Sequence, residues 1–196
     1  MQDASRLSRR EVLRLFALGG GAVLLTACGA GASGVPSAMA RKGYLYLSVM
    51  DGGMIGKPGW PTFVPGDFAV PANATVQCEI RCFDDGAAPV PSKYAKVTGT
   101  VGNSMVVIPS VEGALSAKGS RVSAMDASKV SHTLTVESLG INVPMPPSST
   151  VRFQIKTGAG GRYTWRCMAP CGTGKDGMGG TMAASGWMTG TMTVQT

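Results

Sequence analysis

The sequence has 196 residues, of which 44% are hydrophobic and 15% are charged, and 18 Lys and Arg against 11 Asp and Glu give a net charge of +7. The basic residues are scattered, with no basic stripe and no interleaved aromatic residues, which argues against a nucleic-acid-binding surface. A weak attraction to an anionic membrane surface or to an acidic protein partner is compatible with this charge.

The N-terminus has the pattern of an export signal. Ser8, Arg9 and Arg10 form a basic start, and the apolar run at 15–25 that follows is too short to span a bilayer. The adjacent arginines, followed by Val12 and Leu13, resemble a twin-arginine (Tat) signal, whose substrates cross the membrane already folded. We therefore expect the protein to be exported.

A lipidation motif ends this signal. Leu25-Thr26-Ala27-Cys28 matches the lipobox of bacterial lipoproteins, in which the signal is cut before a cysteine that then carries the lipid. The prediction is a signal peptide over 1–27, lipidation at Cys28 and a place on the extracytoplasmic face of a membrane, periplasmic or at the cell surface. An ordinary signal peptide ending near a cysteine is the alternative. Removing 1–27 takes away four basic and two acidic residues, which leaves a net charge of +5.

The rest of the chain is predicted to be a flexible tether over 28–43 and one β-rich domain over 44–196. Alternating apolar residues and Gly or Pro turns indicate many short strands, and so an all-β sandwich or barrel. The range 84–129 interrupts the pattern and is expected to be an insertion with one or two hairpins of its own. Strands are expected within 43–53, 66–83, 131–140, 149–158, 161–167 and 190–196.

No segment after the signal has a sustained helical period. The methionine-rich stretch over 177–192 is too rich in glycine to predict a packed helix.

Four cysteines remain after Cys28, in a compartment that permits disulfides. Cys78 and Cys82 lie on one face of a predicted strand, about 13 Å apart at roughly 3.3 Å per residue, too far to bridge each other. They are either small buried residues or partners of another cysteine. Cys167 and Cys171 lie close together in a glycine-rich loop, where they form a metal cage, a redox pair or a structural staple.

His132 is the one histidine of the sequence, and it stands at the start of a predicted strand. The stretches "VSHTLTVESLGINVPMPP" and "GRYTWRCMAPCG" follow one another as a strand opened by a histidine, a Leu-Gly and proline turn, and a strand that ends in Tyr-x-x-x-Cys-x-x-x-Cys-Gly. This order resembles the cupredoxins, and most closely the copper-binding periplasmic domain of cytochrome c oxidase subunit II. The resemblance covers 130–196 well and 60–83 more loosely.

The resemblance implies a Greek-key β-sandwich with copper bound by His132, Cys167, Cys171 and Met178, and with Met182 as a possible alternate ligand. It departs from the family at one position. The second histidine that the family has eight residues after the first cysteine is Lys175 here, and a protonated lysine is a poor copper ligand. Neither the dinuclear site nor the mononuclear blue-copper site, which also needs two histidines, is complete. Cys82 ends the strand that runs up to this site in the family, so an accessory role stays open.

The sequence therefore predicts a membrane-anchored copper protein that transfers electrons, is not an enzyme and works with a redox partner or a copper donor or acceptor. Two alternatives remain: a copper chaperone or storage protein, and a metal-free fold stapled by a Cys167–Cys171 disulfide. A thiol-disulfide exchange enzyme favours two intervening residues at a helix N-terminus, which this sequence does not indicate. A hydrolase lacks an evident acid and nucleophile to accompany the histidine.

Overall fold

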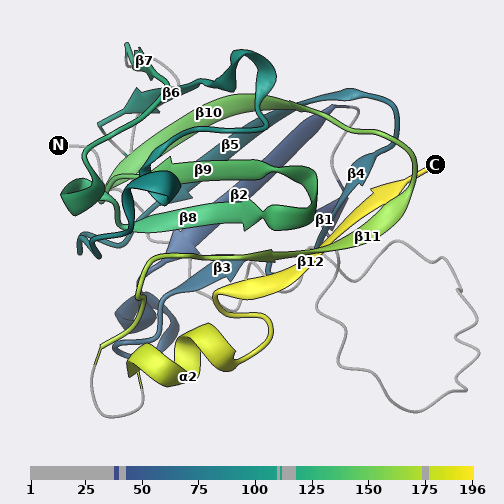
Figure 1. Cartoon of the computed structure of the whole chain (residues 1–196). Helices are drawn as coiled ribbons and strands as arrows, with labels where there is room; N and C mark the ends of the chain where they lie inside the picture. Colours follow the sequence, from purple (N-terminus) through teal and green to yellow (C-terminus); the bar gives the residue numbers. More distant parts are fainter. Residues whose placement is uncertain (1–37, 40–42, 110, 112–117, 174–176) are drawn as a thin grey trace, which may run out of the picture. The chain divides into compact units, whose positions relative to one another are not determined.

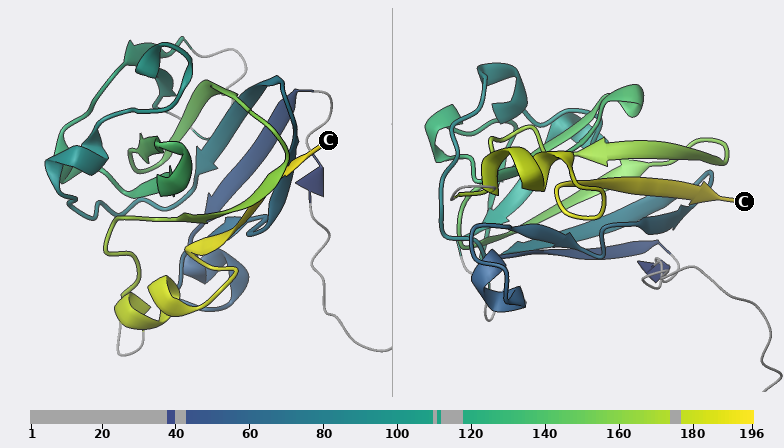
Figure 2. Two further views of the ribbon diagram at one scale, coloured as in Figure 1. Left: turned by 45° about the vertical axis from the view of Figure 1, so that its right-hand side comes forward. Right: turned by 90° about the horizontal axis from the view of Figure 1, so that it is seen from below.

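The computed structural model describes residues 38–39, 43–109, 111, 118–173 and 177–196. Residues 34–196 form one compact unit, and its described part is almost entirely β-structure, arranged as two mixed six-stranded sheets that pack face to face (Figures 1 and 2). This confirms the prediction of an all-β sandwich. Among the described residues, no helix is long and apolar enough to cross a bilayer.

The first sheet contains the strands that lead to the predicted site. Its strand order is β1-β4-β12-β11-β8-β9, with β4 and β12 parallel and β12, β11, β8 and β9 antiparallel in succession. The strands are β1 (Ala38–Met39), β4 (Phe68–Pro71), β8 (His132–Val136), β9 (Ile141–Met145), β11 (Gly161–Arg166) and β12 (Thr189–Gln195).

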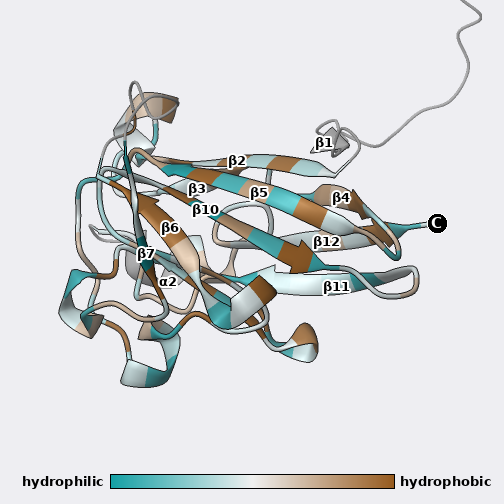
Figure 3. Ribbon diagram, turned by 90° about the horizontal axis from the view of Figure 1, so that it is seen from above, coloured by the Kyte–Doolittle hydropathy of each residue, from teal (hydrophilic) through white to brown (hydrophobic). Residues whose placement is uncertain are grey.

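The second sheet has the order β3-β2-β5-β10-β6-β7, with β2 and β5 parallel and the other pairs antiparallel. Hydrophobic and polar segments alternate along β5 and β10, as Figure 3 shows, because one face of each strand is turned to the core. The strands are β2 (Tyr44–Met50), β3 (Thr62–Val64), β5 (Thr75–Cys82), β6 (Met105–Ile108), β7 (Ser120–Val122) and β10 (Ser149–Lys156).

The core between the sheets centres on Trp165, which is fully buried. Its ring lies 4.7 Å from that of Phe63, and its indole Nε1 donates to the carbonyl of Gly66 at 2.7 Å. This bond satisfies the buried indole N–H and ties β11 to the turn after β3. The strand that leads to Cys167 is therefore held, near its C-terminal end, by the packing and by the hydrogen bond of Trp165.

The range expected to be an insertion forms part of the sandwich. The hairpin β6–β7 extends the second sheet through pairing of β6 with β10, and η2 (Ser92–Ala95), η3 (Val101–Asn103) and η4 (Ala127–Lys129) are short 3-10 turns. Another such turn, η5 (Glu137–Leu139), links β8 to β9. The sequence pattern missed β9, because the stretch from Leu139 and Gly140 to Pro146 and Pro147 was read as a turn.

The expectation that no helix follows the signal is wrong for 177–183. This stretch forms α2 (Gly177–Ala183), which lies at one end of the sandwich beside η1 (Gly52–Ile55) (Figure 1). A Cβ on Gly180 would lie 2.4 Å from the ring of Trp60, so this glycine permits a close contact that a larger residue would prevent. Packing against an aromatic ring outweighs the low helix propensity of glycine here.

Candidate metal centre

Strands β8 and β11 bring the predicted ligands to one end of the first sheet. His132 is the first residue of β8, and Cys167 directly follows β11, whose last residue Arg166 pairs with Thr135 of β8. The backbone N–H of Cys167 donates to the carbonyl of Met188 at 2.8 Å. Cys167 is thus fixed by strands on either side, as its position directly off a strand predicts.

The loop after Cys167 turns back on itself. The N–H of Cys171 donates to the carbonyl of Ala169 at 2.8 Å, and the two sulfur atoms of Cys167 and Cys171 lie 3.1 Å apart. Thr133 holds the first half of the loop, because its hydroxyl accepts from the N–H of Met168 at 2.8 Å. This tight turn brings together two thiols that are four residues apart in sequence.

The imidazole of His132 completes a three-atom group. Its Nδ1 lies 2.9 Å from the sulfur of Cys171 and 3.9 Å from that of Cys167, and the three candidate ligand atoms all lie within 4.8 Å of one another. All three residues are buried, and His132 is only 2% exposed. The three ligands that the sequence predicted from two strands and one loop therefore converge on one point in the core.

Asp84 holds the other side of the imidazole, and the sequence reasoning did not predict it. Its Oδ2 lies 3.0 Å from Nε2 of His132, and its Oδ1 accepts from the N–H of Gly86 at 2.8 Å. A carboxylate at Nε2 fixes a proton on that nitrogen and turns Nδ1 toward the sulfurs. The local signal that could have identified it is its place two residues after β5, at the same end of the sandwich.

Charge alternates through this group. Burial acts to lower the pKa of His132, but the hydrogen bonds to Asp84 and to Cys167 outweigh it and raise the pKa to about 9. Burial acts in the opposite direction on Cys167, yet hydrogen bonds from Cys171 and His132 bring the pKa of its thiol well below the usual range. The hydrogen bond to that thiolate, together with burial, raises the pKa of Cys171. These pKa shifts favour a carboxylate at Asp84, an imidazolium at His132, a thiolate at Cys167 and a neutral thiol at Cys171.

A backbone donor stabilises this thiolate. The N–H of Thr133, the second residue of β8, donates to the sulfur of Cys167 at 3.3 Å. Such a bond favours the charged form of a thiol, so strand β8 supports Cys167 as well as providing His132.

The three ligand atoms are spaced closely enough for one soft metal ion. A circle through Nδ1 and the two sulfurs has a radius of about 2.0 Å, within the range of about 2.0–2.3 Å for metal bonds to imidazole nitrogen and thiolate sulfur. Two thiolates beside an imidazole are a donor set that copper(I) prefers, and zinc accepts it as well. Zinc in a structural site wants four ligands, whereas three of the described residues converge here. The residues present fit copper.

The remaining sites predicted from the sequence fall in different places. The side chain of Met178 lies outside the described part of the chain. Lys175 and Cys28 also lie outside it. Met182 is on α2, and together with Cys167 and Met168 it lines a cavity of about 400 Å³. This cavity places two thioethers beside the thiolate.

Cys82 is close to the group but does not join it. Its sulfur is fully buried and lies 3.6 Å from the carbonyl of Asp84 and 3.9 Å from the hydroxyl of Ser131. Cys78 is buried farther along the same strand, and all four cysteines of the domain are free.

Structural comparison finds matches among proteins of two kinds. The structure of the sodium-dithionite-reduced auracyanin of Roseiflexus castenholzii matches at 12% identity and a TM-score of 0.38, over 80% of this chain and 99% of that one. Auracyanin B matches at 12% identity and a TM-score of 0.35, over 82% and 91%. A multi-copper oxidase of Pediococcus acidilactici matches at 10% identity and a TM-score of 0.37, over 90% of this chain but 31% of that one.

No protein-family model and no curated protein sequence matches the chain. At these identities and TM-scores, the functional argument depends on the residues of the site itself.

Proposed function

We propose that the protein binds one copper ion at His132, Cys167 and Cys171 and transfers electrons at the extracytoplasmic face of a membrane. The observation that carries the proposal is the convergence of Nδ1 and the two sulfurs within 4.8 Å of one another, in the core of a β-sandwich. Copper bound there would take up and release one electron. The cupredoxin-like order of histidine, turn, strand and cysteine loop supports the same assignment.

The surrounding residues suit a site that must not reorganise. Cys167 and His132 are anchored to neighbouring strands, and Asp84 fixes the imidazole through Nε2. Burial keeps solvent away from the donor atoms, so little solvent has to reorganise when an electron is transferred. A rigid and dry set of soft ligands is what a one-electron carrier requires, and nothing in this arrangement needs a bound substrate. We propose that the protein is not an enzyme.

Copper loading tests this proposal. Residues 34–196, one compact unit, are expressed and loaded with copper(I), and metal content is compared with the optical spectrum after oxidation. We expect one copper per chain and a thiolate-to-copper absorption band. A preparation without that band, with Cys167 and Cys171 joined in a disulfide, would establish the metal-free alternative instead.

Copper donation is the second candidate function, and the cavity beside the site favours it. Met168 and Met182 line this cavity together with Cys167, and thioethers suit the passage of copper(I). Transfer of copper to a chelator separates the two functions. Exchange within seconds supports a donor, whereas retention over hours supports an electron carrier.

The similarity to subunit II predicts the result of restoring the missing ligand. Lys175 occupies the position of the family's second histidine, so Lys175→His is expected to add a second copper and the mixed-valence spectrum of the dinuclear site. The measurement is metal content with electron paramagnetic resonance. A variant that binds no more copper than the parent chain would show that the family likeness does not extend to this loop.

Membrane anchoring through Cys28 completes the proposal. A single acyl chain binds a membrane only marginally, but lipoprotein modification supplies several, which makes the attachment stable. Cys28→Ser is expected to release the protein or leave it unprocessed. A variant that stays lipid-labelled and membrane-bound would contradict the assignment.

A further inference from the structure

The outer face of the second sheet carries an unusual set of polar and aromatic side chains, far in sequence from the metal centre. Strands β2, β5 and β10 run side by side, and their register places Tyr44 beside Gln77 and Gln77 beside Gln154. The next row along the same face places Tyr46 beside Glu79 and Glu79 beside Arg152. Such rows bring side chains from separate strands onto one continuous surface.

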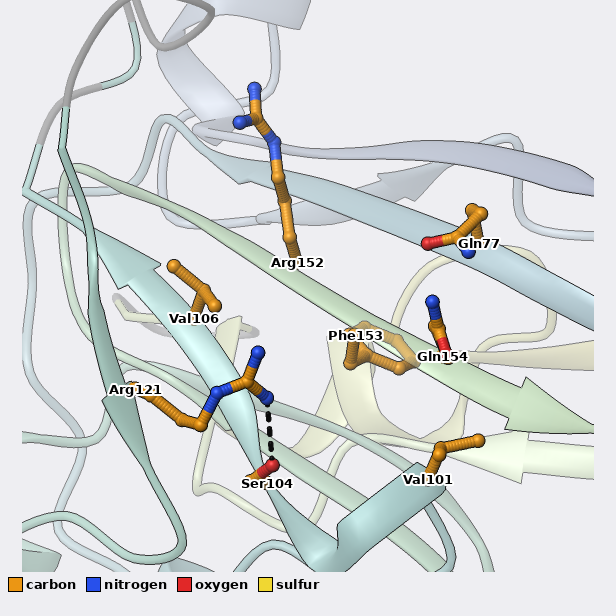
Figure 4. A pocket seen from close by; sticks show the side chains of 8 residues that line it. All are labelled: Gln77, Val101, Ser104, Val106, Arg121, Arg152, Phe153 and Gln154. Atoms are coloured by element: carbon orange, nitrogen blue, oxygen red, sulfur yellow. Dashed lines mark hydrogen bonds between the residues drawn. The ribbon is translucent and has the colours of Figure 1, made fainter.

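A pocket lies at one end of this face. It has a volume of about 300 Å³, at the lower limit for small-ligand sites, and Gln77, Gln154, Ser104 and Arg121 contribute polar groups to its lining. Figure 4 shows Arg121 reaching from β7 toward Ser104, to whose hydroxyl it donates at 3.0 Å. The two glutamine side chains stand on neighbouring strands of the floor. The pocket offers both donors and acceptors of hydrogen bonds.

Two exposed tyrosines lie at the other end. Tyr44 and Tyr46 are 50% and 58% exposed, and their rings are parallel within 8°, with centroids 6.0 Å apart. Two exposed aromatic rings side by side form a small apolar patch, and contiguous patches of this kind can mark a binding surface. The rings provide an apolar stacking surface, and their hydroxyl groups remain available at its edge.

The charge of the face is positive. Arg81, Arg121, Arg152 and Lys156 stand on these strands against one carboxylate, Glu79, which pairs with Arg81 at 2.8 Å and with Arg152 at 2.9 Å. An anionic partner therefore complements this surface, and a guanidinium such as that of Arg121 is suited to bind a carboxylate through two N–H groups.

We propose that this face binds an acidic saccharide chain, whose carboxylate meets Arg121 in the pocket and whose sugar rings extend over the glutamines to Tyr44 and Tyr46. Sugar rings have hydroxyl groups that both donate and accept, which suits the amides, and an apolar C–H face that stacks on aromatic rings. An acidic peptide would instead be expected to add a strand at a sheet edge. This surface, apart from Arg121 on the edge strand β7, lies on the outer face of the interior strands β2, β5 and β10.

Direct binding measurements on the full chain test the proposal. Hexagalacturonate is the probe, with maltohexaose as the neutral sugar and poly-L-glutamate and oligo-dT as anions without sugar acids. We expect hexagalacturonate to bind at least about tenfold more tightly than each of the others, and its affinity to fall with rising salt. Equal binding of maltohexaose would overturn the role of charge. Equal binding of poly-L-glutamate or oligo-dT would overturn the role of the saccharide.

Substitutions locate the site. Arg121→Gln is expected to weaken hexagalacturonate binding about tenfold, and Arg162→Gln, an exposed arginine on β11 of the other sheet, serves as the matched control with no change. The double variant Tyr44→Ala, Tyr46→Ala is expected to weaken binding of the hexamer but not binding of the galacturonate monomer. An equal loss in Arg162→Gln, or full binding by Arg121→Gln, would overturn the assignment to this face. Copper content of all variants checks that the fold is intact.

Discussion

The two cysteine pairs of the domain have the same spacing and opposite chemistry. Cys78 and Cys82 are four residues apart on β5, point into the core and have pKa values that burial raises to about 12. Cys167 and Cys171 are also four residues apart, but the loop after β11 brings their sulfurs to 3.1 Å. Spacing in sequence therefore does not decide reactivity.

The local backbone and the neighbouring charges make the difference. An extended strand separates residues four apart by about 13 Å, so the β5 pair cannot share a metal or a bond. The loop pair lies beside the imidazole of His132, which favours the thiolate form of Cys167 despite complete burial. A buried cysteine without a neighbouring cation stays a neutral, core-filling residue, whereas a cysteine beside His132 favours the thiolate form that binds metals.

Among the substitutions, the largest effect is expected from replacing one cysteine of each pair by alanine. Cys167→Ala removes the best-anchored thiolate and should weaken copper(I) binding by about a hundredfold or more, since one of three ligands is lost. Cys78→Ala, its matched control, should keep the parent affinity and lose only core packing. Competition with a copper(I) chelator measures both. Similar copper(I) affinities of the two variants would show that the two cysteine pairs do not differ in metal binding.

Copper affinity is expected to depend steeply on pH. Below about pH 9 the metal-free site carries a proton on His132 and another on Cys171, and a ligand must lose its proton to bind. Affinity should therefore rise with pH, by about a hundredfold per pH unit below 9 and about tenfold above it, where His132 is already neutral. Chelator competition from pH 6 to 10 measures this slope. A flat profile would contradict the charge pattern of the loop pair.

Replacing the imidazole should weaken the site without abolishing it. His132→Ala is expected to lower copper(I) affinity by about thirtyfold, because both sulfurs persist while the neighbouring positive charge is lost. The same variant should raise the pKa of Cys167 toward that of Cys78, which thiol titration by ultraviolet absorbance measures. An unchanged pKa of Cys167 in this variant would mean that His132 does not cause the chemical difference between the two cysteine pairs.

The smallest effect is expected at Asp84, which acts through His132. Asp84→Asn keeps the shape of the side chain but weakens the hold on Nε2, and affinity should fall about tenfold. Asp85→Asn, on the exposed neighbouring residue, is the matched control. The imidazole signals in nuclear magnetic resonance spectra should shift in the first variant and stay in place in the second. Equal shifts would assign the effect to the loop as a whole.

The parts of this site that depend on local pattern were predictable from sequence. His132 opens a strand, and Cys167 and Cys171 follow the next aromatic strand, so all three could be named in advance. Asp84 could not, since 48 residues separate it from His132 and only the tertiary fold brings the segment after β5 close to the start of β8. Helix α2 was missed for the same reason, because Trp60, more than a hundred residues away, supplies the contact that Gly180 permits.

X-ray absorption at the copper edge of the copper-loaded protein tests the central claim most directly. The account predicts one copper with two sulfur neighbours and one imidazole nitrogen, and loss of one sulfur neighbour in Cys167→Ala but not in Cys78→Ala. A first shell of oxygen and nitrogen alone, or the same sulfur shell in both variants, would show that His132, Cys167 and Cys171 do not form the metal centre.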